Sequence, residues 1–98
     1  MTLAEVLGNI ELADRGLTVY AEKNPEWSPS SRAILARELE DGAAPRAAEG
    51  LEYVLEVFVV HDVLEVWSAW RGGRIPNVRE KCEAVIHYAE NDSYLPVE

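Results

Sequence analysis

The sequence predicts an α+β fold. It should form one small domain over residues 1–98, with about three strands in a sheet and helices packed on one face of it. Two observations lead to this prediction. A chain of 98 residues can bury a single modest core, which two packed layers would enclose. The apolar residues also recur with two periods, alternating in some segments and helical in others, which predicts the order α-β-β-β-α-α.

The N-terminal segment is expected to form a helix and then a strand. Thr2 and Glu5 stand at the spacing of a capping box, so a short helix is predicted over residues 2–9. Its apolar face would consist of Leu3, Val6, Leu7 and Ile10. Residues 17–23 alternate between apolar and polar side chains after a turn, which predicts a strand that buries Leu17, Val19 and Ala21.

The middle of the chain, residues 24–50, fits more than one secondary structure. Trp27 lies in a loop between two prolines, where it would either fold back as a lid on the core or stand exposed for binding. Residues 32–41 contain strong helix formers, yet we predict a strand there because the sheet would otherwise be too small. Residues 45–49 suit one helical turn. The link over residues 41–50 fits either a hairpin or a short crossover.

The most apolar stretch runs from residue 51 to residue 70. Its first half alternates, so residues 51–60 are predicted to form the central strand. One face of that strand would be wholly apolar, with Leu51, Tyr53, Leu55, Val57 and Val59. The other face would be mixed, with Glu52, Val54, Glu56, Phe58 and Val60.

Two helices are expected to complete the domain. Asp62 and Glu65 have the spacing of a capping box, and the Gly72-Gly73 pair would end the helix that they begin. Its buried face would carry Val63, Val66, Trp67 and Trp70. Asn77 and Glu80 predict a second capped helix ending near residues 91–92, followed by a tail that either docks or frays. Its buried stripe would contain Val78, Cys82, Val85, Ile86 and Ala89.

The charge balance narrows the classes of partner. Eighteen acids against nine bases give a net charge of −9, which disfavours direct binding to nucleic acid and favours basic partners. Simple solubility is the alternative explanation of the same charge. A single cysteine and the lack of a signal-like start predict a cytoplasmic protein. No apolar run is long enough to predict membrane insertion.

Residues capable of chemistry are present, but their patterns do not predict a catalytic site. His61, Glu65, Glu83 and His87 could form a metal site only if two separate surfaces met. Arg71, Arg74, Arg79 and Lys81 near a helix start could hold an anion or could be ordinary solvated bases. Cys82 fits a small core residue. We therefore expect a protein that is not an enzyme and that has no catalytic residue, metal or cofactor.

Acidic and aromatic residues suggest a surface for binding a protein. Acids around an apolar centre suit a basic partner, because the acids steer its approach and the aromatic side chains anchor it. A solvated sheet face is the alternative explanation. The candidate partner-binding residues are Glu38, Glu40, Glu52, Glu56, Phe58 and Trp27.

Three segments of the second half also carry a resemblance to a known class of proteins. They read GLEYVLEV, VHDVLEVW and EAVIHYAENDSYL, the last containing YAENDSY over residues 88–94, and LTVYAEK precedes them in the first half. The pattern resembles small, acidic, uncharacterised bacterial proteins similar to polymorphic-toxin immunity proteins. This resemblance implies a non-enzymatic inhibitor that binds a cognate toxin and occludes its surface.

Other functions stay open on the sequence alone. An acidic DNA mimic that inhibits a nucleic-acid-binding machine would need carboxylates spaced like phosphates on one face. A small ligand-binding or enzymatic domain would use His61, Asp62 and Glu65 in a concave pocket. Self-association as a homodimer is a further alternative.

Overall fold

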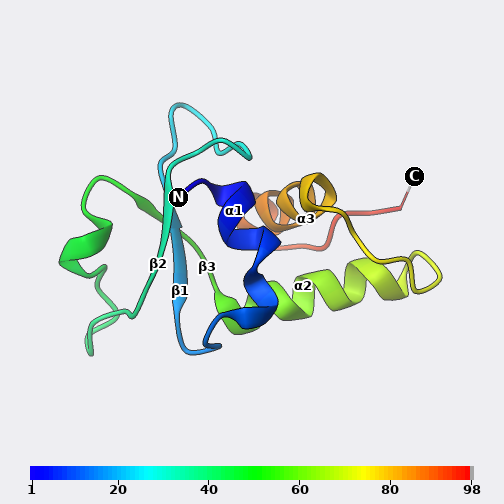
Figure 1. Cartoon of the computed structure of the whole chain (residues 1–98), viewed down its shortest axis with the longest axis horizontal. Coiled ribbons are helices and arrows are strands. Elements are labelled where there is room, and N and C mark those ends of the chain that lie inside the picture. Colours follow the sequence, from blue (N-terminus) through cyan, green and yellow to red (C-terminus); the bar gives the residue numbers. More distant parts are fainter. Residues whose placement is uncertain (98) are drawn as a thin grey trace.

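A computed structural model of the protein describes residues 1–97 and has the predicted order of helices and strands, with two short 3-10 helices added (Figure 1). The α-helices are α1 (Leu3–Gly8), α2 (Val57–Ala69) and α3 (Val78–Asn91). The strands are β1 (Thr18–Ala21), β2 (Ala33–Ala36) and β3 (Glu52–Glu56), and the 3-10 helices are η1 (Ile10–Leu12) and η2 (Arg46–Ala48). The α+β prediction is confirmed, including a strand within residues 32–41 and a helical turn within residues 45–49.

β1 lies in the middle of the sheet, in the order β2-β1-β3, so the prediction that residues 51–60 form the central strand is wrong. All four residues of β1 are buried, whereas β3 exposes its first two, and the middle of a sheet suits the strand that is covered on both sides. Both neighbours run antiparallel to β1 and are therefore parallel to each other. The chain between them must cross a face of the sheet, so the 41–50 link is a crossover.

The two faces of the sheet are covered by different segments. Alternation along β1 sends Val19 into the main core, which the helices cover, and Tyr20 to the opposite face. The crossover covers part of that opposite face, where Ala48 and Leu51 pack with Tyr20 (Figure 1). We call this the outer sheet face, and its side chains are Thr18, Tyr20, Ile34, Ala36, Glu38, Tyr53 and Glu56.

The junction between β3 and α2 differs from the prediction. The strand ends at Glu56, and the chain is helical from Val57 onward. The buried residues of the helix are spaced three, three and four apart, as an amphipathic helix requires: Val57, Val60, Val63 and Trp67. Residues 57–60 are apolar throughout, and so short an apolar run does not separate strand from helix by its period. The predicted strand was therefore too long.

The earlier start of α2 changes the role of Asp62. Glu56 occupies the N-cap position without a side-chain hydrogen bond, and Asp62 lies inside the helix, exposed. The predicted Asp62 cap is therefore wrong. The caps at Thr2 and Asn77 are confirmed, because each side chain accepts a hydrogen bond from the backbone N–H three residues later. Both capping boxes are complete.

Three side chains depart from the predicted helix faces. Trp70 is 52% exposed and Val78 is 41% exposed, whereas Lys81 is buried. Lys81 Nζ donates to the carbonyl oxygen of Leu7 at 3.4 Å and to a carboxylate oxygen of Glu11 at 3.0 Å. The apolar stem of Lys81 thus fills the space between α3 and α1, while its ammonium group reaches polar acceptors at the edge.

The C-terminal tail docks on the helices. Tyr94 lies edge-on to Trp70, with ring centroids 5.8 Å apart, and its centroid is 5.2 Å from that of Tyr88. Leu95 packs against the main core. Among the helices described over residues 1–97, none is long and apolar enough to cross a membrane.

Candidate protein-binding surface

A register shift in the β1–β3 pair separates two glutamates that the sequence placed on one face. Glu56 pairs with Thr18 on the outer sheet face, whereas Glu52 pairs with Ala21, whose side chain lies in the main core. Paired residues share a face, so Glu52 points to the helix side of the sheet at its exposed end. The shift leaves Val54 as an extra residue in β3, which is a β-bulge. The prediction of a shared face is therefore wrong.

The same bulge brings Tyr53 to the outer sheet face. Its ring is edge-on to that of Tyr20, with centroids 6.4 Å apart and planes at 79°. The sequence predicted a buried Tyr53, but its side chain is 45% exposed. Simple alternation over residues 51–60 contains no signal for a bulge, so sequence reasoning missed this surface aromatic residue.

Burial and nearby acids control the ionisation of the two tyrosines. The pKa of Tyr53 is raised to about 12, chiefly by burial. A hydrogen bond to Glu56 and the negative charges of Glu56 and Glu38 contribute to the same rise. Burial also raises the pKa of Tyr20, again with help from Glu38 and Glu56. The Thr18 hydroxyl donates to a carboxylate oxygen of Glu38 at 2.9 Å. Both tyrosines therefore stay neutral far above physiological pH.

A groove of about 400 Å³ lies beside β3, between the strand, α2 and the end of α3. Its lining residues are apolar or aromatic except for two carboxylates, Glu56 and Asp92. We call it the β3 edge groove, and its lining residues are Tyr53, Val54, Leu55, Glu56, Val59, Tyr88, Ala89 and Asp92. The groove combines apolar, polar and negatively charged surface and has no basic lining residue.

The remaining predicted contact residues are spread more widely. Glu40 is exposed in the crossover, away from any strand. Phe58 is 50% exposed on the first turn of α2, two residues after Glu56. Trp27 is half-buried as a lid on the main core, where its Nε1 donates to the carbonyl oxygen of Ala21 at 3.1 Å. The structure thus brings Glu38 and Glu56 together and places Glu40, Glu52, Phe58 and Trp27 apart from them.

The family of the chain follows from its sequence as a whole. Residues 1–97 match a protein family described as a domain of unknown function, DUF7716. The chain belongs to this family. The expectation of an uncharacterised family is thereby confirmed. No curated protein and no solved structure matches the chain.

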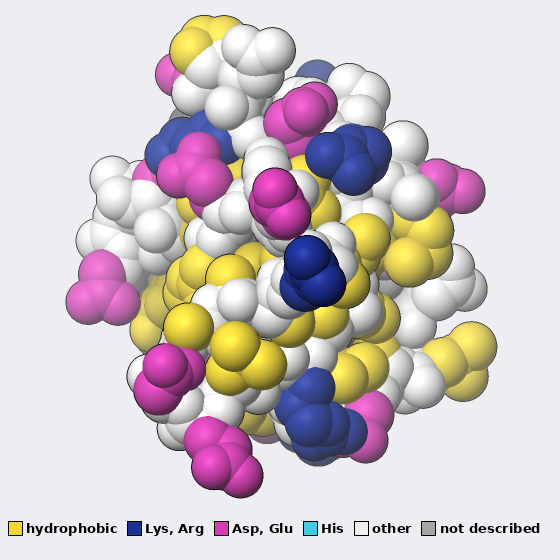
Figure 2. Space-filling view, turned by 90° about the vertical axis from the view of Figure 1, so that its left-hand side faces the viewer, with side chains coloured by type: hydrophobic (Ala, Val, Ile, Leu, Met, Phe, Trp, Pro, Cys, Tyr) yellow, Lys and Arg dark blue, Asp and Glu magenta, His cyan; other side chains and the backbone are white. Residues whose placement is uncertain are grey.

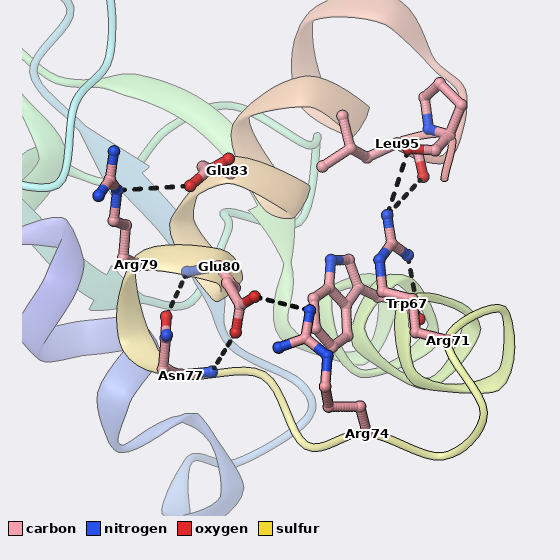
Figure 3. Close-up of polar contacts among 9 residues, drawn as sticks. Trp67, Arg71, Arg74, Asn77, Arg79, Glu80, Glu83 and Leu95 are labelled. Carbon is pink, nitrogen blue, oxygen red and sulfur yellow. Dashed lines mark hydrogen bonds and ion pairs between the residues drawn. The ribbon is translucent and has the colours of Figure 1, made fainter. Parts of the chain in front are cut away.

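This DUF7716 chain has a second hollow, where α2, α3 and the tail meet (Figure 3). It measures about 300 Å³, and Trp67 forms part of its wall. The guanidinium groups of Arg71 and Arg74 lie 4.4 Å and 4.7 Å from the centre of the Trp67 ring. Arg71 also donates to the carbonyl oxygens of Trp67, Leu95 and Pro96, so it fastens the tail to α2.

Each base of the possible anion site has an acceptor within the chain. Arg74 pairs with Glu80 at 2.8 Å, Arg79 pairs with Glu83 at 3.5 Å, and Lys81 pairs with Glu11. Hydrogen bonding to Asn77 and the charge of Arg74 lower the pKa of Glu80. These contacts organise the loop and the start of α3, which favours a structural role for this basic cluster.

The other titratable residues do not converge on one site. Asp62 and Glu65 line a hollow of about 240 Å³ with Tyr94, but His61 is not part of its lining. Cys82 is buried, and burial raises the pKa of its thiol, so the thiol form is favoured. Within residues 1–97, no group of three His, Cys, Asp or Glu residues could hold a metal ion.

Proposed function

We propose that this protein is a non-enzymatic inhibitor that binds a basic protein. Most concretely, it would be an immunity-type antidote that neutralises a cognate toxin by covering its surface. The observation that carries the proposal is the β3 edge groove, where the exposed ring of Tyr53 and the partly buried ring of Tyr88 lie beside carboxylates at the border of the sheet. The resemblance of the second half of the chain to immunity proteins supports the same class.

The distribution of side chains supports a mixed interface rather than a purely electrostatic one. Figure 2 shows the side of the molecule that carries the crossover, with hydrophobic side chains gathered in the middle and both acids and bases among and around them. A DNA mimic would instead present ordered rows of carboxylates. Tyr53, which lines the groove and is 45% exposed, offers an aromatic anchor of the kind that dominates protein interfaces, whereas Phe58, 50% exposed, lies outside the groove.

Charge and aromatic contacts would contribute in different ways. The net charge of −9 attracts a basic partner over a distance and speeds association, an effect that salt weakens. The aromatic residues bury apolar area only after contact, so they slow dissociation. Inhibition then needs no chemistry from this chain, because a bound inhibitor excludes the substrate of the toxin.

The test is co-purification with the product of the adjacent gene and with a panel of basic toxin domains. We expect one of them to bind more tightly than about 1 μM at moderate salt and to lose its activity at equimolar inhibitor. If none binds that tightly, the proposal is wrong.

A pair of matched variants adds specificity to this test. Glu56→Lys and Glu83→Lys change the net charge equally, but only Glu56 lines the groove, whereas Glu83 lies on α3 and pairs with Arg79. We expect Glu56→Lys to weaken binding about tenfold or more and Glu83→Lys to weaken it only slightly. Equal weakening by the two variants would indicate that net charge alone drives the association.

A further inference from the structure

The two edges of the sheet differ in how they are covered. The outer edge of β2 meets the N-terminus, where the N–H of Ala33 donates to the carbonyl oxygen of Met1 at 2.7 Å and Thr2 forms a bridge with Arg32. β3 lies at the opposite edge, and in the described part of the chain only β1 pairs with it. The outer edge of β3 therefore presents backbone groups that can pair with another strand.

The β3 edge groove runs beside that free edge. Val59 of α2 and the exposed ring of Tyr53 supply apolar surface next to the strand, whose Val54 and Leu55 side chains are themselves buried, and Tyr88 and Ala89 from α3 complete the lining. A strand added to β3 would place alternate side chains against this surface while its backbone pairs with the strand. We propose that the partner inserts an extended basic segment here as an added strand of the sheet. The inference follows from the free edge, the groove and its charge, and it rests on the proposed function.

Charge argues for a basic segment. Glu56 and Asp92 line the groove, no Lys or Arg does, and Glu52 is exposed at the other end of β3. A lysine or arginine at each end of an added segment would lie near a carboxylate, with Glu56 on the outer sheet face and Glu52 on the helix side. Cross-strand pairs of opposite charge stabilise a sheet.

The same charges argue against a second copy of this chain as the occupant. β3 reads Glu-Tyr-Val-Leu-Glu, which is symmetric in charge about Val54. Two copies joined along this edge would bring the Glu52 and Glu56 carboxylates of both copies to one junction. Like charges gathered at one edge destabilise strand pairing, so these glutamates disfavour a second copy of the chain as the occupant.

The test uses synthetic peptides of about six residues, which is the length of a typical strand and lets the two terminal side chains face opposite sides. The first peptide alternates Val and Thr between two terminal lysines, and the second has glutamates in place of the lysines. The third is the lysine peptide with N-methyl groups on the backbone nitrogens that would donate to β3. Binding is measured by titration, and amide hydrogen exchange locates the contact on the full chain.

We expect the lysine peptide to bind and to slow exchange at β3 amides. N-methylation should weaken binding about tenfold or more, since it removes backbone hydrogen bonds and leaves the charge unchanged. The glutamate peptide should not bind the native chain, and the double variant Glu52→Lys/Glu56→Lys should reverse this preference. Retained circular dichroism would show that the double variant is folded.

Several results would overturn the inference. The inference is wrong if the lysine peptide does not bind at millimolar concentration or if the N-methylated peptide binds as tightly as the lysine peptide. It is also wrong if the bound peptide slows amide exchange only in elements other than β3. A stable dimer of the free chain that protects β3 would identify a second copy as the occupant. If the lysine peptide binds at β3 but no basic toxin is captured, the proposed immunity role is wrong and the edge inference stands. If a toxin is captured but does not slow amide exchange in β3, the edge inference is wrong and the proposed immunity role stands.

Discussion

At the scale of single residues, Tyr53 shows how one side chain is controlled by a local irregularity. The bulge at Val54 turns Tyr53 to the outer sheet face, next to Tyr20 and close to Glu56. Its hydroxyl is thereby held in the neutral form. The surface that we propose for binding thus depends on an aromatic residue that the alternating sequence predicts to be buried.

This placement of Tyr53 predicts a loss of stability at alkaline pH. The pKa of Tyr53 is about 12 in the folded chain, against 10.0 for an ordinary tyrosine. The folded state therefore holds more protons than the unfolded state between pH 10 and 12, and the contribution of Tyr53 to stability is lost as the pH rises through that range. Urea unfolding midpoints from pH 9 to 12 should fall less steeply in Tyr53→Phe than in the native chain. Identical slopes would contradict the raised pKa.

At the scale of the elements, the boundary between β3 and α2 decides which residues face the core. In a strand, Phe58 and Val60 would share one face. In α2, Val60 is fully buried, whereas Phe58 is half exposed. Hydrophobic periodicity fails here because residues 57–60 are apolar throughout, so the helix is recognised only from the spacing of Val57, Val60, Val63 and Trp67.

Substitutions at these two positions test the boundary. Val60→Ala should reduce the free energy of unfolding by about 2 kcal/mol, because it leaves a cavity in the main core. Phe58→Ala should cost less than about 1 kcal/mol, because half of the ring is already in water. Urea denaturation measures both. A larger loss for Phe58→Ala than for Val60→Ala would contradict the helical assignment.

The capping box of α3 makes a separate prediction at the same scale. Asn77 and Glu80 each satisfy a backbone N–H of the other, and Glu80 also pairs with Arg74. Asn77→Ala should therefore cost about 1 kcal/mol, as measured by thermal or urea unfolding.

Acid should weaken the same cap. The pKa of Glu80 is lowered from 4.5, so its contribution is complete above that value and is lost as the pH falls through the lowered pKa. Glu80→Gln should lower stability at neutral pH and flatten the fall of stability below pH 4.5. If stability falls as steeply below pH 4.5 in Glu80→Gln as in the native chain, Glu80 does not contribute to the loss of stability in acid.

At the scale of the whole molecule, long-range contacts tie the ends of the chain to the domain. The N-terminus bridges to the start of β2, and the tail is fastened by Arg71 and by the packing of Tyr94 against Trp70 and Tyr88. The tail thereby forms one wall of the hollow between α2 and α3 that Trp67 also lines.

Removal of the residues after Asp92 tests the role of the tail. The truncated chain should lose about 2 kcal/mol of stability, because Tyr94 and Leu95 no longer bury their apolar surface. Tryptophan fluorescence should shift to longer wavelength as Trp67 and Trp70 become more exposed to water. Arg71→Ala in the intact chain should give a smaller change of the same sign, since it removes the hydrogen bonds and the contact with Trp67 but leaves Tyr94 and Leu95 in place.

The sequence by itself determined the features that depend on neighbouring residues. These are the two capping boxes, the alternation of β1, the number and order of the main elements and the net charge, each of which is encoded within a few positions or in the composition. The candidate acids Glu38 and Glu56 were also found in this way.

Only the tertiary structure decided the features that depend on distant pairing. These are the central place of β1, the bulge that separates Glu52 from Glu56 and exposes Tyr53, the end of β3 at Glu56 and the burial of Lys81 against α1. The physical reason is that strand order, register and burial are set by which surfaces meet, and the partners of these residues are far away in the sequence. The free edge of β3, on which the binding proposal depends, is a property of that pairing.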